Sequence, residues 1–188
     1  MGSQKMATAT LLTQAVLGRR HRSIDLRGAL TLLVCAGLPL GLFGLVNLGA
    51  EALDILPFFF APFGLPGWSG AVLHLSQLFL LGCAMGVLVI NSAARPARFW
   101  LVGLTGAYIL LPFVTPPLDS LQLSILCATL FLFGIATLRR VGAQSGLAGW
   151  LMVPMLGVLG FSATMGLVLT AAYTPPFALM QGQNPPAS

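Results

Sequence analysis

Long apolar stretches alternate with short polar connectors along the whole chain. A helix needs about 20 consecutive apolar residues to cross a bilayer. Five stretches approach or exceed this length, at residues 28–50, 70–92, 99–118, 121–138 and 147–173. The fourth is short, whereas the fifth is long enough to require tilt or an interfacial end. The pattern predicts an all-α integral membrane protein, a bundle of five transmembrane helices preceded by a basic cytoplasmic tail (1–27) and followed by a flexible tail (174–188).

The composition supports lipid as the solvent of this fold. Charged residues make up 7% of the 188 residues and hydrophobic residues 57%, against about 25% charged in a typical soluble domain. A soluble protein of this size could not hide so much apolar surface. The net charge of +5 comes from short basic clusters between apolar stretches, which is typical of membrane loops rather than of a nucleic-acid-binding face.

The basic clusters also predict an orientation. Arginines precede the first stretch and follow the second and fourth, at Arg19, Arg20, Arg22, Arg27, Arg95, Arg98, Arg139 and Arg140. The alternate connectors hold Glu51, Asp54 and Asp119 and no basic residue. Because basic connectors stay on the cytoplasmic side, we expect the N-terminus inside and the C-terminus outside, with a bacterial inner membrane as the location.

The first connector, residues 51–69, is apolar and aromatic and carries Pro57, Pro62 and Pro66. Three prolines at this spacing exclude a regular helix, and irregular backbone is not stable when it faces lipid hydrocarbon. The segment is therefore expected either to anchor at the interface or to fold over the bundle as a lid. Phe63 and Trp68 are its candidate ligand-contacting aromatics.

His74 is the one ionisable residue well inside a predicted span, and such residues point to function in membrane proteins. Gln77 lies three residues later and Trp68 about two turns before Gln77, so we expect all three on one face toward the first connector. A neutral imidazole there either ligates a haem iron, hydrogen-bonds a ligand carboxylate, or bonds to a neighbouring helix. Tyr108 is a further polar anchor.

Other classes of function have less support. The sequence has no nucleophile elbow, no HExxH motif and no phosphate-binding glycine loop, so an enzymatic role stays open but is not indicated. An ion-coupled transporter would usually bury a carboxylate at mid-depth, and none is found there. Cys35, Cys83 and Cys127 lie in separate apolar stretches, which favours packing over a disulfide or a zinc site.

Small residues and prolines punctuate the predicted helices. Gly82 and Gly86 form a GxxxG pair, as do Gly37 and Gly41. Such pairs let helices approach closely, within the bundle or in a homodimer. Three prolines lie inside or near the end of spans and are expected to kink them, at Pro39, Pro112 and Pro154.

Several of these features occur together in a known family. The first connector ends in Leu65–Trp68, "LPGW", leading directly into the second stretch; the first stretch has a central Pro39; the third ends near Pro112; and the fifth carries Val153 and Pro154. With five spans in under 200 residues, this arrangement resembles the TspO/MBR family of tryptophan-rich sensory and translocator proteins. The chain departs from the family in having three tryptophans and Gly67 near the position of a second proline.

The resemblance implies a five-helix bundle, commonly dimeric, with a cavity capped by the first connector that takes porphyrins, haem or sterol-like molecules. It implies Trp68 as a cavity wall and Pro154 as a pocket residue of the fifth helix. The leading hypothesis is a membrane protein that binds a flat hydrophobic ligand, with candidate site residues Phe63, Trp68, His74, Gln77, Tyr108 and Pro154. The alternatives are a structural subunit of a respiratory or photosynthetic membrane complex and, less favoured, a small transporter.

Overall fold

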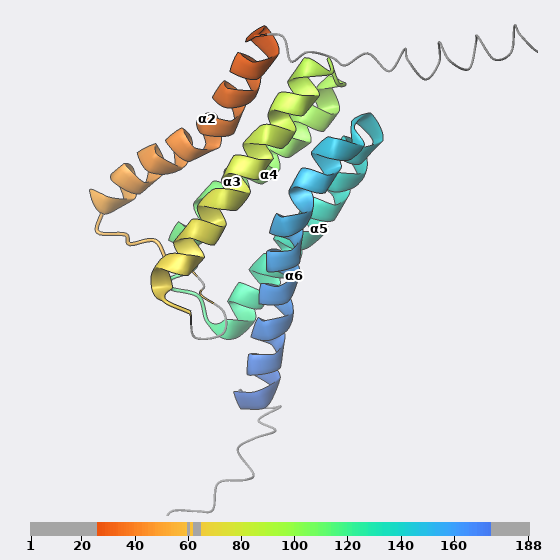
Figure 1. The fold of residues 1–188 in the computed structure, drawn as a ribbon. Helices are drawn as coiled ribbons and strands as arrows, with labels where there is room; N and C mark the ends of the chain where they lie inside the picture. Colours follow the sequence, from red (N-terminus) through yellow and green to blue (C-terminus); the bar gives the residue numbers. More distant parts are fainter. Residues whose placement is uncertain (1–25, 60, 62–64, 174–188) are drawn as a thin grey trace, which may run out of the picture.

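The computed structural model describes residues 26–59, 61 and 65–173, and within these residues the chain is entirely helical apart from its connectors. The five helices are α2 (Leu26–Glu51), α3 (Gly67–Ile90), α4 (Arg95–Val114), α5 (Ser120–Gln144) and α6 (Gly146–Tyr173) (Figure 1). Each is long and apolar enough to cross a membrane. The prediction of five long apolar helices is confirmed.

α3 is the central helix of the bundle, because it contacts α2, α4 and α6. α5 packs against α4 and, most extensively, against α6, to which the single residue Ser145 joins it. α2 lies at the edge, largely against α3 (Figure 1). The largest fully buried apolar side chains come from α3, α4 and α6: Leu78, Leu81, Leu88, Leu101, Leu104, Met152, Met155 and Leu159.

The Gly82–Gly86 pair forms the contact between α3 and α2. A Cβ added to Gly82 would lie 2.4 Å from the carbonyl oxygen of Cys35, and one added to Gly86 would lie 3.3 Å from the Cβ of Cys35. This GxxxG pair therefore serves packing within the chain. Around Gly37 and Gly41 of α2 an added Cβ would meet nothing within 4 Å, so a homodimer through that face stays a prediction.

α2 bends near its middle, where Pro39 lies (Figure 1). Proline removes one backbone N–H and its ring clashes with the preceding turn, which bends a helix. The first half of α2 makes the close approach to Gly82. The second half is held by Phe43. Its ring centroid lies 5.6 Å from that of Phe113 and 6.1 Å from that of Phe59.

Several helix ends differ from the predicted spans; α3 begins at Gly67 rather than at residue 70, and α4 at Arg95 rather than at residue 99. Two further differences have a clear local reason. α4 ends at Val114 rather than at residue 118, because Pro116 and Pro117 follow and cannot continue the helical hydrogen bonds. α5 continues to Gln144 rather than ending at residue 138. Hydropathy falls at Arg139 and Arg140, but arginine has a high helix propensity, so the helix continues beyond the apolar stretch.

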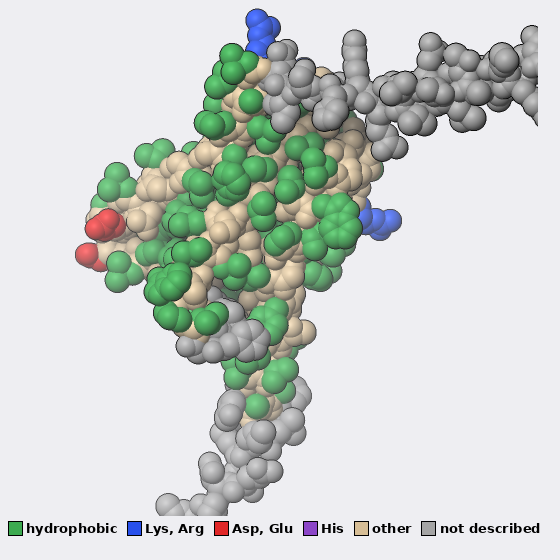
Figure 2. Space-filling model, viewed as in Figure 1, with side chains coloured by type: hydrophobic (Ala, Val, Ile, Leu, Met, Phe, Trp, Pro, Cys, Tyr) green, Lys and Arg blue, Asp and Glu red, His purple; other side chains and the backbone are tan. Residues whose placement is uncertain are grey.

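The described charges separate to opposite ends of the bundle. Arg27, Arg95, Arg98, Arg139 and Arg140 belong to the end where α2 and α4 begin and α3 and α5 finish. Glu51, Asp54 and Asp119 belong to the other end, and Figure 2 shows acidic side chains beyond the end of α2. The positions agree with the alternation of basic and acidic connectors in the sequence.

Candidate functional site

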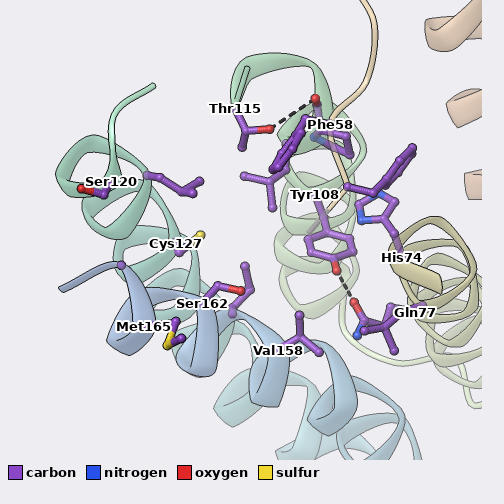
Figure 3. A pocket seen from close by; sticks show the side chains of 18 of the residues that line it. Phe58, His74, Gln77, Tyr108, Thr115, Ser120, Cys127, Val158, Ser162 and Met165 are labelled. Carbon is purple, nitrogen blue, oxygen red and sulfur yellow. Dashed lines mark hydrogen bonds between the residues drawn. The ribbon is translucent and has the colours of Figure 1, made fainter. Parts of the chain in front are cut away.

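A cavity of about 130 Å³ lies between α3, α4, α5 and α6 at the acidic end of the bundle, beside the first connector (Figure 3). Its walls are mostly aliphatic and aromatic. On one side His74 and Gln77 of α3 face Tyr108 of α4, and Thr115, Ser120 and Ser162 add hydroxyl groups elsewhere on the wall. The cavity therefore combines apolar enclosure with a few polar groups, as ligand sites commonly do.

The first connector forms part of the cavity wall and is attached to the end of α4. Phe58 and Phe59 line the cavity, and the Phe58 N–H donates a hydrogen bond of 2.8 Å to the carbonyl of Pro112. In a continuing helix that carbonyl would accept from the residue four positions later, but this is Pro116, which has no N–H. Pro116 therefore leaves the Pro112 carbonyl available to the Phe58 N–H. The Thr115 hydroxyl also donates to this carbonyl, at 3.3 Å.

His74 is 7% exposed and sits in an aromatic enclosure. Its ring stacks on that of Tyr108, with centroids 4.4 Å apart and planes 25° from parallel. The rings of Phe43 and Phe59 lie 5.6 and 5.7 Å away. These contacts fix the imidazole, yet its buried Nε2 has no hydrogen-bond partner among the described residues.

Gln77 is 2% exposed and lies on the same face of α3 as His74. The Tyr108 hydroxyl donates to Gln77 Oε1, which sets the orientation of the amide. The Gln77 Nε2 group is then left buried without a partner in the described part of the chain. An unsatisfied buried polar group costs about 1–3 kcal/mol, so a hydrogen-bond acceptor beside these nitrogens would stabilise the site.

The structure brings three of the predicted site residues together and not the others. His74, Gln77 and Tyr108 line the same cavity. Trp68 is 68% exposed and does not line it. It lies nine residues before Gln77, and at about 3.6 residues per turn this separation is about two and a half turns, which puts it on the opposite side of α3. The expectation that all three share one face is corrected accordingly.

Pro154 and Phe63 complete the predicted set. Pro154 is exposed on α6, one turn before Val158, where the α6 lining of the cavity begins. It is therefore displaced along the helix from the cavity. Phe63 lies outside the described residues.

Sequence reasoning missed the wall that α5 and α6 contribute, including Ser120, Cys127, Ser162 and Met165. These side chains reach the cavity because α5 and α6 pack closely, at contacts such as Gly166, where an added Cβ would lie 2.9 Å from the Cβ of Ser124. No local pattern marks them, since their positions depend on how the two helices pair. Phe58 and Phe59 carried a signal, the aromatic character of the first connector.

The cavity volume limits what fits. It is close to the volume of an engineered cavity that binds benzene, about 150 Å³, and below the about 300–1,000 Å³ of sites for drug-sized ligands. One ring fits, whereas a whole porphyrin or haem does not fit the cavity as it stands. The described residues contain no group of three or more potential metal ligands.

Comparisons of this chain with protein-family models, with curated proteins and with solved structures found no match. The resemblance to the TspO/MBR family thus stays a prediction from the sequence motifs.

Proposed function

We propose that this chain is an integral membrane protein that binds a flat, apolar ligand in the cavity below the first connector. The observation that carries the proposal is the pair of buried nitrogens, His74 Nε2 and Gln77 Nε2, which lack partners in the described residues beside an apolar cavity. The ligand class that matches is a ring carrying a hydrogen-bond acceptor. Gln77 supplies a donor, and a neutral histidine supplies either a donor or an acceptor at Nε2.

The proposal places the N-terminus in the cytoplasm of a bacterium and the cavity near the outer side of the inner membrane. The support is the separation of arginines and carboxylates to opposite ends of the bundle. Kinship with the TspO/MBR family forms part of the proposal. A porphyrin, haem or sterol would enter only with an outward movement of the Phe58–Phe59 segment, which the Phe58–Pro112 hydrogen bond opposes.

The structural-subunit hypothesis has one observation in its favour, the exposure of the glycine face of α2 around Gly37 and Gly41. It gives no reason for a cavity with two unpartnered nitrogens, so ligand binding is preferred. The transporter hypothesis has less support, because the described carboxylates all lie at one end and none lies inside the bundle.

The test compares two ring compounds of similar size on the full chain in mild detergent. Acetophenone carries a carbonyl acceptor, and ethylbenzene is its hydrocarbon counterpart. One hydrogen bond is worth about 0.5–1.5 kcal/mol net, so we expect acetophenone to bind about two- to tenfold more tightly by calorimetric titration. His74→Phe, which keeps an aromatic ring but removes the nitrogens, should reduce that preference.

The matched control is Cys83→Ser, a residue of α3 that does not line the cavity, and it should keep the preference. Equal binding of the two compounds, or a preference that survives both His74→Phe and Gln77→Leu, would refute the proposed chemistry. Protoporphyrin IX belongs in the same panel, because its binding at comparable affinity would show that the Phe58–Phe59 segment opens. Stoichiometric partner chains with no response to any compound would favour the structural subunit.

A further inference from the structure

An open hollow of about 660 Å³ lies at the basic end of the bundle, between the start of α4 and the end of α5. Half of its lining residues are alanines, at Ala94, Ala97, Ala136 and Ala143. Their short side chains leave a depression between the two helices. Arg139, Arg140 and Gln144 also line it, so the hollow combines apolar side chains with basic and amide donors.

Arg140 is held in place by an aromatic contact. Its guanidinium carbon lies 3.8 Å from the ring centroid of Trp100, and Trp100 in turn packs on Phe133 with centroids 5.3 Å apart. A cation over an indole face is stabilised by the ring quadrupole. A guanidinium carries five N–H donors, so a contact of this kind with an aromatic ring does not use up its capacity to bind an anion.

The hollow has no anionic partner of its own in the described part of the chain. Glu51, Asp54 and Asp119, the described carboxylates, all belong to the opposite end of the bundle. Gln144 Oε1 accepts a hydrogen bond of 3.5 Å from the Ala94 N–H, which leaves the Gln144 amide hydrogens as donors. Two cations and one amide thus surround a space that would attract an anion.

We propose that this hollow binds the phosphate headgroup of an anionic phospholipid from the cytoplasmic leaflet. Phosphate oxygens would accept from Arg139, Arg140 and Gln144. The acyl chains would run along the apolar surface of α5 next to the hollow, where Leu132, one turn before the lining residue Ala136, is 67% exposed. Tryptophan and arginine are both favoured at headgroup depth. The inference rests on the proposed membrane insertion but not on the ligand cavity at the other end.

The test offers the full chain, in mild detergent, phosphatidylglycerol and phosphatidylcholine with identical acyl chains, and counts bound lipids by native mass spectrometry. We expect preferential retention of phosphatidylglycerol. Removal of one arginine should lower the preference about fivefold, the factor that corresponds to about 1 kcal/mol per basic side chain near an anionic surface. Arg139→Gln with Arg140→Gln should abolish it, whereas Arg139→Lys with Arg140→Lys should keep part of it.

The control is Arg27→Gln, which removes the same charge at the same end of the bundle but outside the hollow. An equal loss in Arg27→Gln and in Arg140→Gln would show diffuse attraction and overturn the site, as would unchanged preference in the double glutamine variant. Glycerol phosphate, added as a soluble competitor, distinguishes a lipid from a free anion. Displacement of the lipid by glycerol phosphate at matched concentration would overturn the assignment to a lipid headgroup.

Discussion

The close approach of α2 to α3 at Gly82 allows a quantitative test of the fold. In Gly82→Ala the new Cβ would lie 2.4 Å from Cys35 O and 2.7 Å from Ala36 Cα, whereas ordinary contacts begin at 3.4 Å. Both neighbours are backbone atoms, so no side chain can rotate away. The helices must separate by about 1 Å, the difference between 3.4 and 2.4 Å.

The expected cost follows from two opposing terms. Overpacking of a well-packed contact costs about 1–3 kcal/mol, and the contact with backbone atoms places Gly82→Ala at the upper end. Against this, replacing glycine by alanine within a helix stabilises the helix by about 1 kcal/mol. The net destabilisation is about 2 kcal/mol, and at about 2–4 °C per kcal/mol for a chain of this size the melting temperature should fall by about 4–8 °C.

The assay is thermal unfolding in one mild detergent, followed by far-ultraviolet circular dichroism. Gly41→Ala is the matched control, because it makes the same chemical change in the middle of α2 where an added Cβ meets nothing within 4 Å. It should melt at or above the wild-type temperature. If the melting temperature of Gly82→Ala, like that of Gly41→Ala, is equal to or above that of the wild type, the close contact between α2 and α3 at Gly82 is wrong.

Two further predictions concern buried hydrogen bonds. Tyr108→Phe removes the donor to Gln77 Oε1, and the unpaired amide should lower the free energy of unfolding by about 1–3 kcal/mol. In a double-mutant cycle, adding Gln77→Leu should recover most of this loss, whereas additive effects of the two substitutions would contradict the pairing. Ser124→Ala removes a 2.6 Å bond to the Ala163 carbonyl, which should cost about 0.6–1.7 kcal/mol in unfolding titrations. Thr129→Ala, whose hydroxyl bonds within its own helix, is the control and should change little.

The sequence was sufficient for the helices and for part of the site. Hydropathy predicts five long apolar helices, and proline content predicts that the first connector is not helical, because both signals are local. His74 and Gln77 were found together because residues three apart share a helix face. The same reasoning placed Trp68 wrongly, since a separation of nine residues was counted in whole turns.

The rest of the site depends on contacts between distant segments. Nothing around Cys127 or Met165 indicates that their side chains reach the cavity wall, because this follows from the pairing of α5 with α6. The sequence also could not predict whether Gly82 and Gly86 pack within the chain or between two copies of it, because a GxxxG pair fits either contact. Only the location of Cys35 on the facing helix decides between them.

The hydrogen bond from Phe58 to Pro112 has a consequence for biosynthesis. Translation proceeds from the N-terminus, so Phe58 emerges before α3 and α4 exist, and its acceptor is completed only when the last turn of α4 has been made. Until then the first connector lacks its attachment to α4, although the ring contacts of Phe59 with Phe43 of α2 and His74 of α3 can form. A ribosome stalled before Pro112 would therefore leave Phe58 without its acceptor, and the attachment of this connector to the bundle would be complete only after α4 is made.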